Sequence, residues 1–153
     1  MSDLSQLKHE RVLALCGQAL QSKKRLFERA AEAMSAELDL DAESIYRALL
    51  AREKLGSTAI GEGVAIPHSR DDHCDDAAGC LITLEEPIDF AAADGKAVDI
   101  VFVLLVPAEA TQEHLNLLAG LATAFSSSDI RSALRDAKTA EQAKQTLLCG
   151  THP

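Results

Sequence analysis

VDIVFVLLV, residues 98–106, is nearly continuous apolar sequence and is rich in valine. Strands that are covered on both faces have this composition, so the stretch predicts a central strand, ended by Pro107. A helix that crosses a membrane needs roughly 20 apolar residues, and no run in this chain approaches that length. We therefore expect a covered sheet and no direct insertion into a membrane.

Helical patterns lie on both sides of this strand. Apolar residues at three- and four-residue steps, behind side chains that cap helices, predict five helices. Two of the expected helices precede the strand. The first runs from a Ser22 cap to about Leu38, and the second runs from an Asp41 cap to roughly Leu55, where Gly56 ends it. Three more helices are expected after the strand. The first begins at Thr111 and runs to about Ser126, and the second begins at Ser128 or Asp129 and runs to Ala137. The third covers Ala140–Leu148 and follows the capping box Thr139-x-x-Gln142.

The remaining segments predict short strands and turns. Residues 56–68 (GSTAIGEGVAIPH) have the glycines and β-branched residues of a hairpin turning at residues 61–63. Residues 69–76 predict a polar turn, and residues 77–84 predict a strand that ends at Glu85-Glu86-Pro87. Residues 88–96 predict a loop with Asp94-Gly95 as its turn. Residues 11–15 fit a strand or a helical turn. Interleaved helices and strands without a linker predict one α/β domain over residues 1–153.

The charge balance argues against one class of partner, and the cysteines indicate the cellular compartment. The 153 residues include 15 Lys and Arg against 24 Asp and Glu, a formal net charge of −9. Phosphate backbones are bound mostly through Lys and Arg, so we expect no nucleic-acid partner. Charged residues near the N-terminus argue against a signal peptide. Without one, the irregularly spaced cysteines predict reduced thiols in a cytoplasmic protein: Cys16, Cys74, Cys80 and Cys149.

His114 lies on the apolar stripe of its expected helix, three and seven residues before Leu117 and Leu121. It also lies in the first turn, where backbone N–H groups and the helix dipole favour an anion. The helix follows a central strand, and ligands of α/β sheets favour that edge. Taken alone, these features favour a core histidine bonded to a backbone carbonyl over a ligand-binding one.

His68 and Arg52 are the other candidates. Pro67 stiffens the backbone before His68, although an exposed histidine is the simpler interpretation of that loop. Arg52 lies beside the apolar stripe of its helix, where it could equally complement the negative helix end. Together the two histidines and the arginine suit an anionic group. A neutral imidazole can accept a phosphoryl group if positive neighbours offset its charge.

Metal binding is the weaker interpretation. His68, His73, Cys74 and Cys80 could form a zinc site, but their spacing does not match a short Cys-x-x-Cys knuckle. An acidic cluster in a polar loop is most often solvated surface: Asp71, Asp72, Asp75 and Asp76. We expect no metal and no cofactor.

Two motifs resemble a known family. Residues 52–58 (REKLGST) and 61–68 (GEGVAIPH) resemble the phosphohistidine signature of the fructose/mannitol-type enzyme IIA domains of the bacterial phosphotransferase system. Residues 113–119 (EHLNLLA) resemble the second-histidine helix of that family. Residues 87–95 (PIDFAAADG) and 104–114 (LLVPAEATQEH) are most similar to its nitrogen-related regulatory branch. The resemblance covers residues 22–148.

The resemblance implies a mixed central β-sheet flanked by helices. It implies that His68 accepts a phosphoryl group from an HPr-like carrier, called NPr in the nitrogen-related branch. His114 would steady the phosphate and Arg52 would help electrostatically. With no fused membrane or partner domain in this sequence, the chain would act as a stand-alone regulator, with potassium-transport or sensor proteins as targets.

Three other functions compete with this one. A sugar-specific enzyme IIA would pass the phosphate to a transporter IIB subunit. A binding module that has lost phosphotransfer is disfavoured because His68, His114 and Arg52 are all present. The third is the zinc protein considered above.

Overall fold

The computed structural model describes residue 4, residues 7–109 and residues 112–149. Its centre is a six-stranded mixed sheet in the order β1-β5-β6-β3-β2, in which β4 also pairs with β6. The strands are β1 Val12–Gln18, β2 Ala59–Gly61, β3 Val64–Ala65, β4 His68–Asp71, β5 Ala78–Ile88 and β6 Val98–Pro107. β1 is parallel to β5, and β3 and β4 are parallel to β6, whereas β5–β6 and β2–β3 are antiparallel.

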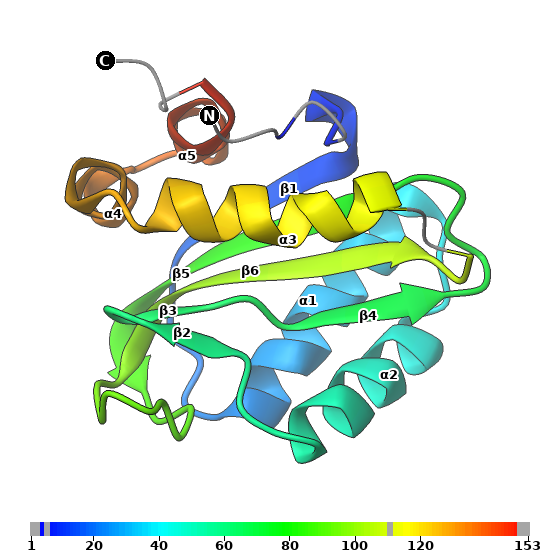
Figure 1. Cartoon of the computed structure of the whole chain (residues 1–153), viewed down its shortest axis with the longest axis horizontal. Coiled ribbons are helices and arrows are strands. Elements are labelled where there is room, and N and C mark those ends of the chain that lie inside the picture. The colour runs from blue at the N-terminus through cyan, green and yellow to red at the C-terminus, as the bar shows by residue number, and fades with distance from the viewer. Residues whose placement is uncertain (1–3, 5–6, 110–111, 150–153) are drawn as a thin grey trace.

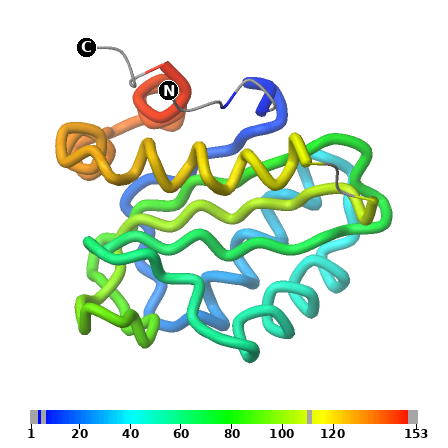
Figure 2. Tube along the Cα trace, viewed as in Figure 1, coloured from blue at the N-terminus to red at the C-terminus, as the bar shows by residue number. Residues whose placement is uncertain are grey.

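The strand expected at residues 98–106 is confirmed as the centre of the molecule. β6 pairs with β5 on one side and with β3 and β4 on the other, and Ile100–Leu105 are at most 1% exposed. In Figure 2, β3 and β4 follow one path along β6. The two pairings have the same register, because Val64 lies opposite Ile100 and His68 opposite Leu104.

Five helices cover the two faces of the sheet: α1 Lys23–Leu38, α2 Ala42–Lys54, α3 Gln112–Phe125, α4 Ser128–Asp136 and α5 Ala140–Cys149. Figure 1 shows α1 and α2 on one face and α3, α4 and α5 on the other. Alternate residues of β6 point to opposite faces, so Val101 and Val103 join the core beneath α1 and α2, whereas Phe102 and Leu104 join the core beneath α3–α5.

Side-chain caps set most of the helix starts. The Ser22 hydroxyl accepts a hydrogen bond from Arg25 N, and the Asp41 carboxylate accepts one from Ser44 N, as the sequence predicts. In front of α5, Thr139 Oγ1 accepts from Gln142 N, and the Gln142 amide oxygen accepts from Lys138 N, which closes the capping box one residue earlier than usual. The predicted start at Thr111 lies outside the described residues.

Four expectations need correction or refinement. Ser127 caps α4, not Ser128 or Asp129. Residues 12–18 form a strand, which resolves the ambiguity over residues 11–15. The turn expected from residue 69 begins later, since β4 continues to Asp71 along β6. β5 runs on through Pro87 to Ile88, because the pairing with β6 is irregular between Thr83 and Ile88 and the proline there needs no ladder hydrogen bond.

Candidate functional site

His68 is the first residue of β4, and its side chain is partly buried. Its Nδ1 lies 2.8 Å from the carbonyl oxygen of Ile66. A carbonyl can only accept a hydrogen bond, so Nδ1 carries the proton in this contact. The lone pair of the neutral ring is therefore on Nε2, which is the nitrogen available for nucleophilic attack.

The backbone around His68 is held on both sides. Ile66 N donates to Thr58 O at 3.0 Å, and Leu104 N donates to Pro67 O at 2.8 Å. Ile66 is buried, and Pro67 fixes its own φ, so the carbonyl that orients the imidazole has little freedom to move. The tautomer of His68 is thus set by main-chain geometry.

The register of β4 decides which face His68 occupies. His68 lies opposite Leu104, and Leu104 belongs to the core beneath α3 together with Leu117 and Leu121. Side chains at paired positions of a sheet share a face, so His68 lies on the α3 side. His114 is the third residue of α3 and is partly buried, one turn before Leu117. The structure therefore brings the two histidines to the same face of the sheet.

Arg70 also lies on this face, and the sequence interpretation missed it. It follows His68 by two residues in β4, is exposed, and lies opposite Val106. Its Nη1 donates to Ala108 O at 3.4 Å, in the segment that leads toward α3. The His-x-Arg spacing could have revealed it, because residues two apart in a strand share a face, but residues 69–76 were expected to form a turn.

Arg52 comes from the opposite layer. It lies in the last turn of α2, whose Ile45 and Leu49 pack in the core on the other face, and its Nη1 donates to Gly56 O at 3.0 Å. This is the helix-end role that was the alternative interpretation of Arg52. Among the described residues, no hydrogen bond or ion pair joins Arg52 to either histidine.

Most of the 52–58 motif has a structural role. The Glu53 side chain is only 7% exposed, and its carboxylate accepts hydrogen bonds from Thr58 Oγ1 at 2.7 Å and from Lys23 Nζ at 2.9 Å. Lys23 Nζ also lies 4.9 Å from the centre of the Phe90 ring. This network fixes the loop between α2 and the hairpin that precedes His68. Sequence reasoning did not identify Glu53.

The β2–β3 hairpin is the one expected around Gly61-Glu62-Gly63. Glu62 and Gly63 have φ values of 58° and 80°, as a two-residue hairpin turn requires. The Arg135 side chain of α4 holds this turn, because its Nη2 donates to Glu62 O at 3.1 Å while the guanidinium binds Asp99. A Cβ on Gly63 would lie 2.8 Å from that Nη2, so a side chain here would have to displace the Arg135 guanidinium.

The residues of the zinc interpretation do not assemble. Within the described part of the chain, no group of three or more His, Cys, Asp or Glu side chains could hold a metal ion. The Cys74 thiol donates to Asp76 O at 2.8 Å, and burial raises the pKa of the Cys80 thiol to about 12. Both sulfurs are therefore unsuited to acting as thiolate ligands.

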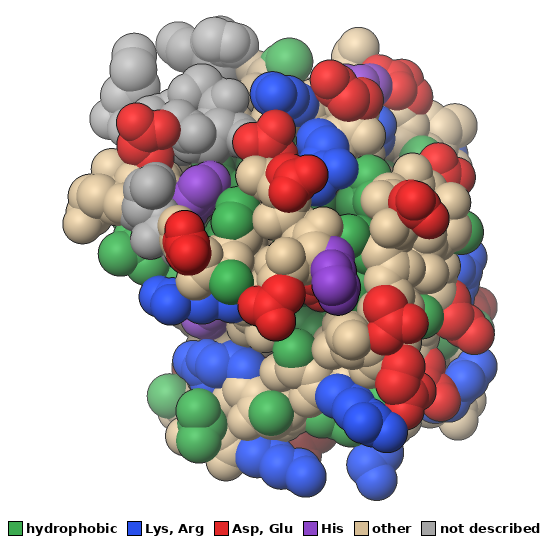
Figure 3. Space-filling model, turned by 90° about the vertical axis from the view of Figure 1, so that its right-hand side faces the viewer, with side chains coloured by type: hydrophobic (Ala, Val, Ile, Leu, Met, Phe, Trp, Pro, Cys, Tyr) green, Lys and Arg blue, Asp and Glu red, His purple; other side chains and the backbone are tan. Residues whose placement is uncertain are grey.

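The charge around the site is mixed. Figure 3 views the molecule from the side where β4 and β6 end, and acidic side chains spread from its top down its right-hand side, while basic ones lie along its lower edge and also near its top. An imidazole with a free Nε2, the Arg70 guanidinium and the first turn of α3 all favour an oxyanion. The arrangement suits attack on a phosphoryl group. No helix in the described residues is long and apolar enough to cross a membrane.

Comparisons with known proteins agree on one family. The family model described as phosphoenolpyruvate-dependent sugar phosphotransferase system, EIIA 2, matches residues 6–149. A nitrogen regulatory protein of Pseudomonas aeruginosa is 47% identical over 128 residues, which cover 83% of each chain. The crystal structure of nitrogen regulatory protein IIA-Ntr from Neisseria meningitidis matches with a TM-score of 0.83 and 43% identity, over 94% of this chain and 97% of that one.

A more distant structure shares the fold. IIA mannitol from Escherichia coli matches with a TM-score of 0.73 at 19% identity, over 92% of this chain and 97% of that one. The mixed sheet flanked by helices, expected from the sequence, is confirmed by both structures. This chain belongs to the EIIA 2 family of the phosphoenolpyruvate-dependent sugar phosphotransferase system.

Proposed function

We propose that the chain is a cytoplasmic phosphohistidine carrier of the nitrogen-related phosphotransferase branch. His68 accepts a phosphoryl group from the phosphohistidine of an HPr-like carrier (NPr). The observation that carries this proposal is the bond from His68 Nδ1 to the Ile66 carbonyl, which leaves the Nε2 lone pair free. Family membership and the similarity to nitrogen regulatory proteins support the choice of branch.

The transfer needs no proton to leave His68. The Nε2 lone pair attacks phosphorus, the new N–P bond forms as the donor's N–P bond breaks, and the donor imidazole leaves with that electron pair. The proton stays on Nδ1 throughout, in its hydrogen bond to the Ile66 carbonyl oxygen. His114 steadies the phosphoryl oxygens, and Arg70 and Arg52 supply positive charge during transfer.

The output of the carrier is regulation of other proteins. A phosphoryl group adds roughly −1.5 to −2 charges at pH 7 to a chain whose formal net charge is already −9. Such a change alters the electrostatics of a binding surface. Targets such as potassium-transport or sensor proteins would then distinguish the two forms of the chain by their charge.

Intact-mass spectrometry tests the acceptor directly. Incubation with purified phospho-carrier should add one phosphate to the wild type and none to His68→Ala. His73→Ala is the matched control, since His73 is exposed in the turn after β4, and it should be phosphorylated normally. The bond should be labile in acid and stable in alkali. Full incorporation in His68→Ala would show that another residue is the acceptor.

The same transfer should run without a metal ion. The positive charge available from arginine side chains and from the first turn of α3 can offset the phosphoryl charge. The reaction should start from purified phospho-carrier, because donor enzymes need Mg²⁺, and should proceed equally with and without EDTA. Loss of transfer in EDTA that added cation restores would contradict this expectation.

A further inference from the structure

A second concave site lies away from His68 along the sheet. It is a cleft of about 410 Å³ between the ends of β1 and β5, the start of β6, and the link from α4 to α5. That volume is within the range of small-molecule sites. Asp99 lines it near the start of β6, whereas His68 pairs with Leu104, so the two sites are separated by roughly 16 Å of strand.

A β-bulge shapes one wall of this cleft. The pairing of β1 with β5 shifts between Leu15 and Gln18, and Gly17 has a φ of 61°. Gly17 N donates to the Thr83 hydroxyl oxygen at 2.9 Å in place of a ladder bond. Thr83 is buried in the cleft wall, and its hydroxyl also makes a hydrogen bond with the Cys16 side chain. Bulges of this kind occur preferentially beside functional sites.

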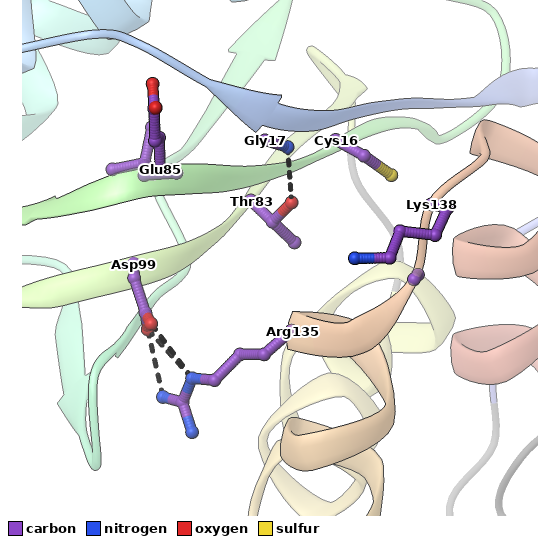
Figure 4. Close-up of a pocket in the computed structure, with 9 residues that line it drawn as sticks. Cys16, Gly17, Thr83, Glu85, Asp99, Arg135 and Lys138 are labelled. Carbon is purple, nitrogen blue, oxygen red and sulfur yellow. Dashed lines mark hydrogen bonds and ion pairs between the residues drawn. The ribbon is translucent and has the colours of Figure 1, made fainter.

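The residues that line the cleft include two cations, Arg135 and Lys138, and two carboxylates, Asp99 and Glu85. Asp99 is neutralised by Arg135, whose Nε and Nη2 both lie 2.9 Å from carboxylate oxygens. Figure 4 shows the Lys138 ammonium directed into the space between Arg135 and the residues of β1 and β5, while the Glu85 carboxylate points away from it. Within the described residues, the Lys138 ammonium has no ion pair or hydrogen bond.

Glu85 is the second acidic residue that lines the cleft, and its exposed carboxylate is directed away from Lys138. The Cys16 thiol donates to Thr139 O at 3.5 Å, and burial raises its pKa, so it stays neutral at physiological pH. The backbone of Lys138 is anchored by the Gln142 side chain, which fixes where its side chain begins. An exposed positive group thus lines a cleft of an acidic protein.

We propose that this cleft binds a small organic anion, with its carboxylate or phosphate group on the Lys138 ammonium and close to Thr83. The body of the ligand would lie along Gly17, Leu84 and Ala137. Succinate and glucose 6-phosphate probe the two sources of the oxyanion, and glucose is the neutral control. This site is independent of phosphotransfer at His68.

Two-dimensional ¹H–¹⁵N NMR titration at constant ionic strength tests the proposal. At least one anion should shift the amide signals of Gly17, Thr83 and Lys138 in a saturable way, and glucose should not. Whether succinate or glucose 6-phosphate binds more tightly identifies the preferred head group. No saturable shift at these amides up to about 20 mM of either anion, or shifts confined to other parts of the chain, would overturn the proposal.

A pair of charge-matched variants separates the cleft from general electrostatics. Lys138→Gln should weaken binding of the anion about tenfold or more, because it removes a charge-assisted contact. Lys24→Gln removes the same charge from an exposed position on α1, on the other face of the sheet, and should leave binding unchanged. Equal affinities for the wild type and Lys138→Gln, with both spectra showing a folded chain, would rule the site out.

Discussion

The chemistry of His68 depends on a single main-chain acceptor. Because Nδ1–H donates a hydrogen bond to the Ile66 carbonyl oxygen, the nitrogen that keeps a free lone pair is chosen by the backbone and not by a carboxylate partner. In the proposed transfer, the neighbouring side chains receive the phosphoryl oxygens. His114 and Arg70 lie on the same face of the sheet, one on α3 and one on β4.

His114→Ala should slow phosphoryl transfer without preventing it. A charge-assisted hydrogen bond to the phosphoryl group contributes roughly 1.5–3 kcal/mol. Its loss from the transition state should lower the transfer rate by about tenfold to a hundredfold. Rapid-quench kinetics with phospho-carrier measure the rate, and the phosphate on His68 should also be shorter-lived. Wild-type rate and lifetime would identify His114 as a core residue only.

Arg70→Gln should lower the transfer rate by about tenfold, since it removes a guanidinium from the His68 face of β4. Arg70→Lys should recover part of the rate, because it restores the charge but not the forked geometry. Arg47→Gln is the control, as Arg47 is an exposed arginine of α2 paired with Glu43. If Arg70→Gln and Arg47→Gln transfer the phosphoryl group at equal rates, Arg70 contributes only surface charge.

The elements that sequence predicts best are those set by local signals. The caps at Ser22 and Asp41 fixed two helix starts, and the apolar run at residues 98–106 fixed the central strand. β4 was missed because its sequence, HSRD, is polar and its strand state depends on pairing with β6. Register with a distant strand cannot be read from local composition.

The same limit applied to the site. The sequence singled out His68 and His114, but the face that each occupies follows from strand pairing. Arg70 was not selected as a site residue, because its segment had been predicted to form a turn. Glu53 was missed because its burial arises from the packing of α1, the loop before β2 and Phe90 around it.

Glu53→Ala should destabilise the layer formed by α1 and α2. It leaves the Thr58 hydroxyl and the Lys23 ammonium without their shared acceptor, and a bond to a charged group contributes about 1.5–3 kcal/mol. Urea titration measures the free energy of unfolding. Glu28→Ala, which breaks an exposed pair with Arg25, should change it by no more than about 1 kcal/mol. Equal effects of the two variants would show that the Glu53 network is not stabilising.

Across the whole molecule, one sheet supports two cores. β5 and β6 contribute alternate residues to both faces, so the layer of α1 and α2 and the layer of α3–α5 share the same strands. We expect the two layers to unfold together, because loss of either exposes one side of β6. The proposed phosphorylation site lies on the α3 face, and its supporting loop lies against the other core.

The molecule should lose stability in acid in part through Asp41 and Asp94. Hydrogen bonds from Ser44 to Asp41, and from Glu62 N to Asp94, lower the pKa of each carboxyl below its ordinary value of 3.8. A lowered folded-state pKa stabilises the protein above about pH 4, and this contribution is lost as the pH falls through the folded-state value. The Asp41→Asn/Asp94→Asn double variant should therefore show a shallower loss of unfolding free energy between about pH 4 and pH 2 in urea titrations. An unchanged pH dependence would assign acid sensitivity to other groups.

The crowding at Gly63 has a consequence for how this family can diverge. Gly63 is constrained twice, by its φ of 80° and by the Arg135 guanidinium that fills the place of a side chain. A relative that loses the Arg135–Asp99 pair is released from the second constraint, and asparagine, which tolerates positive φ, becomes acceptable at position 63. A relative that keeps the pair should favour glycine, because any side chain would have to displace the guanidinium. Positions 63, 99 and 135 should therefore covary across lineages, even though they are far apart in the sequence and none of them belongs to the proposed phosphotransfer site.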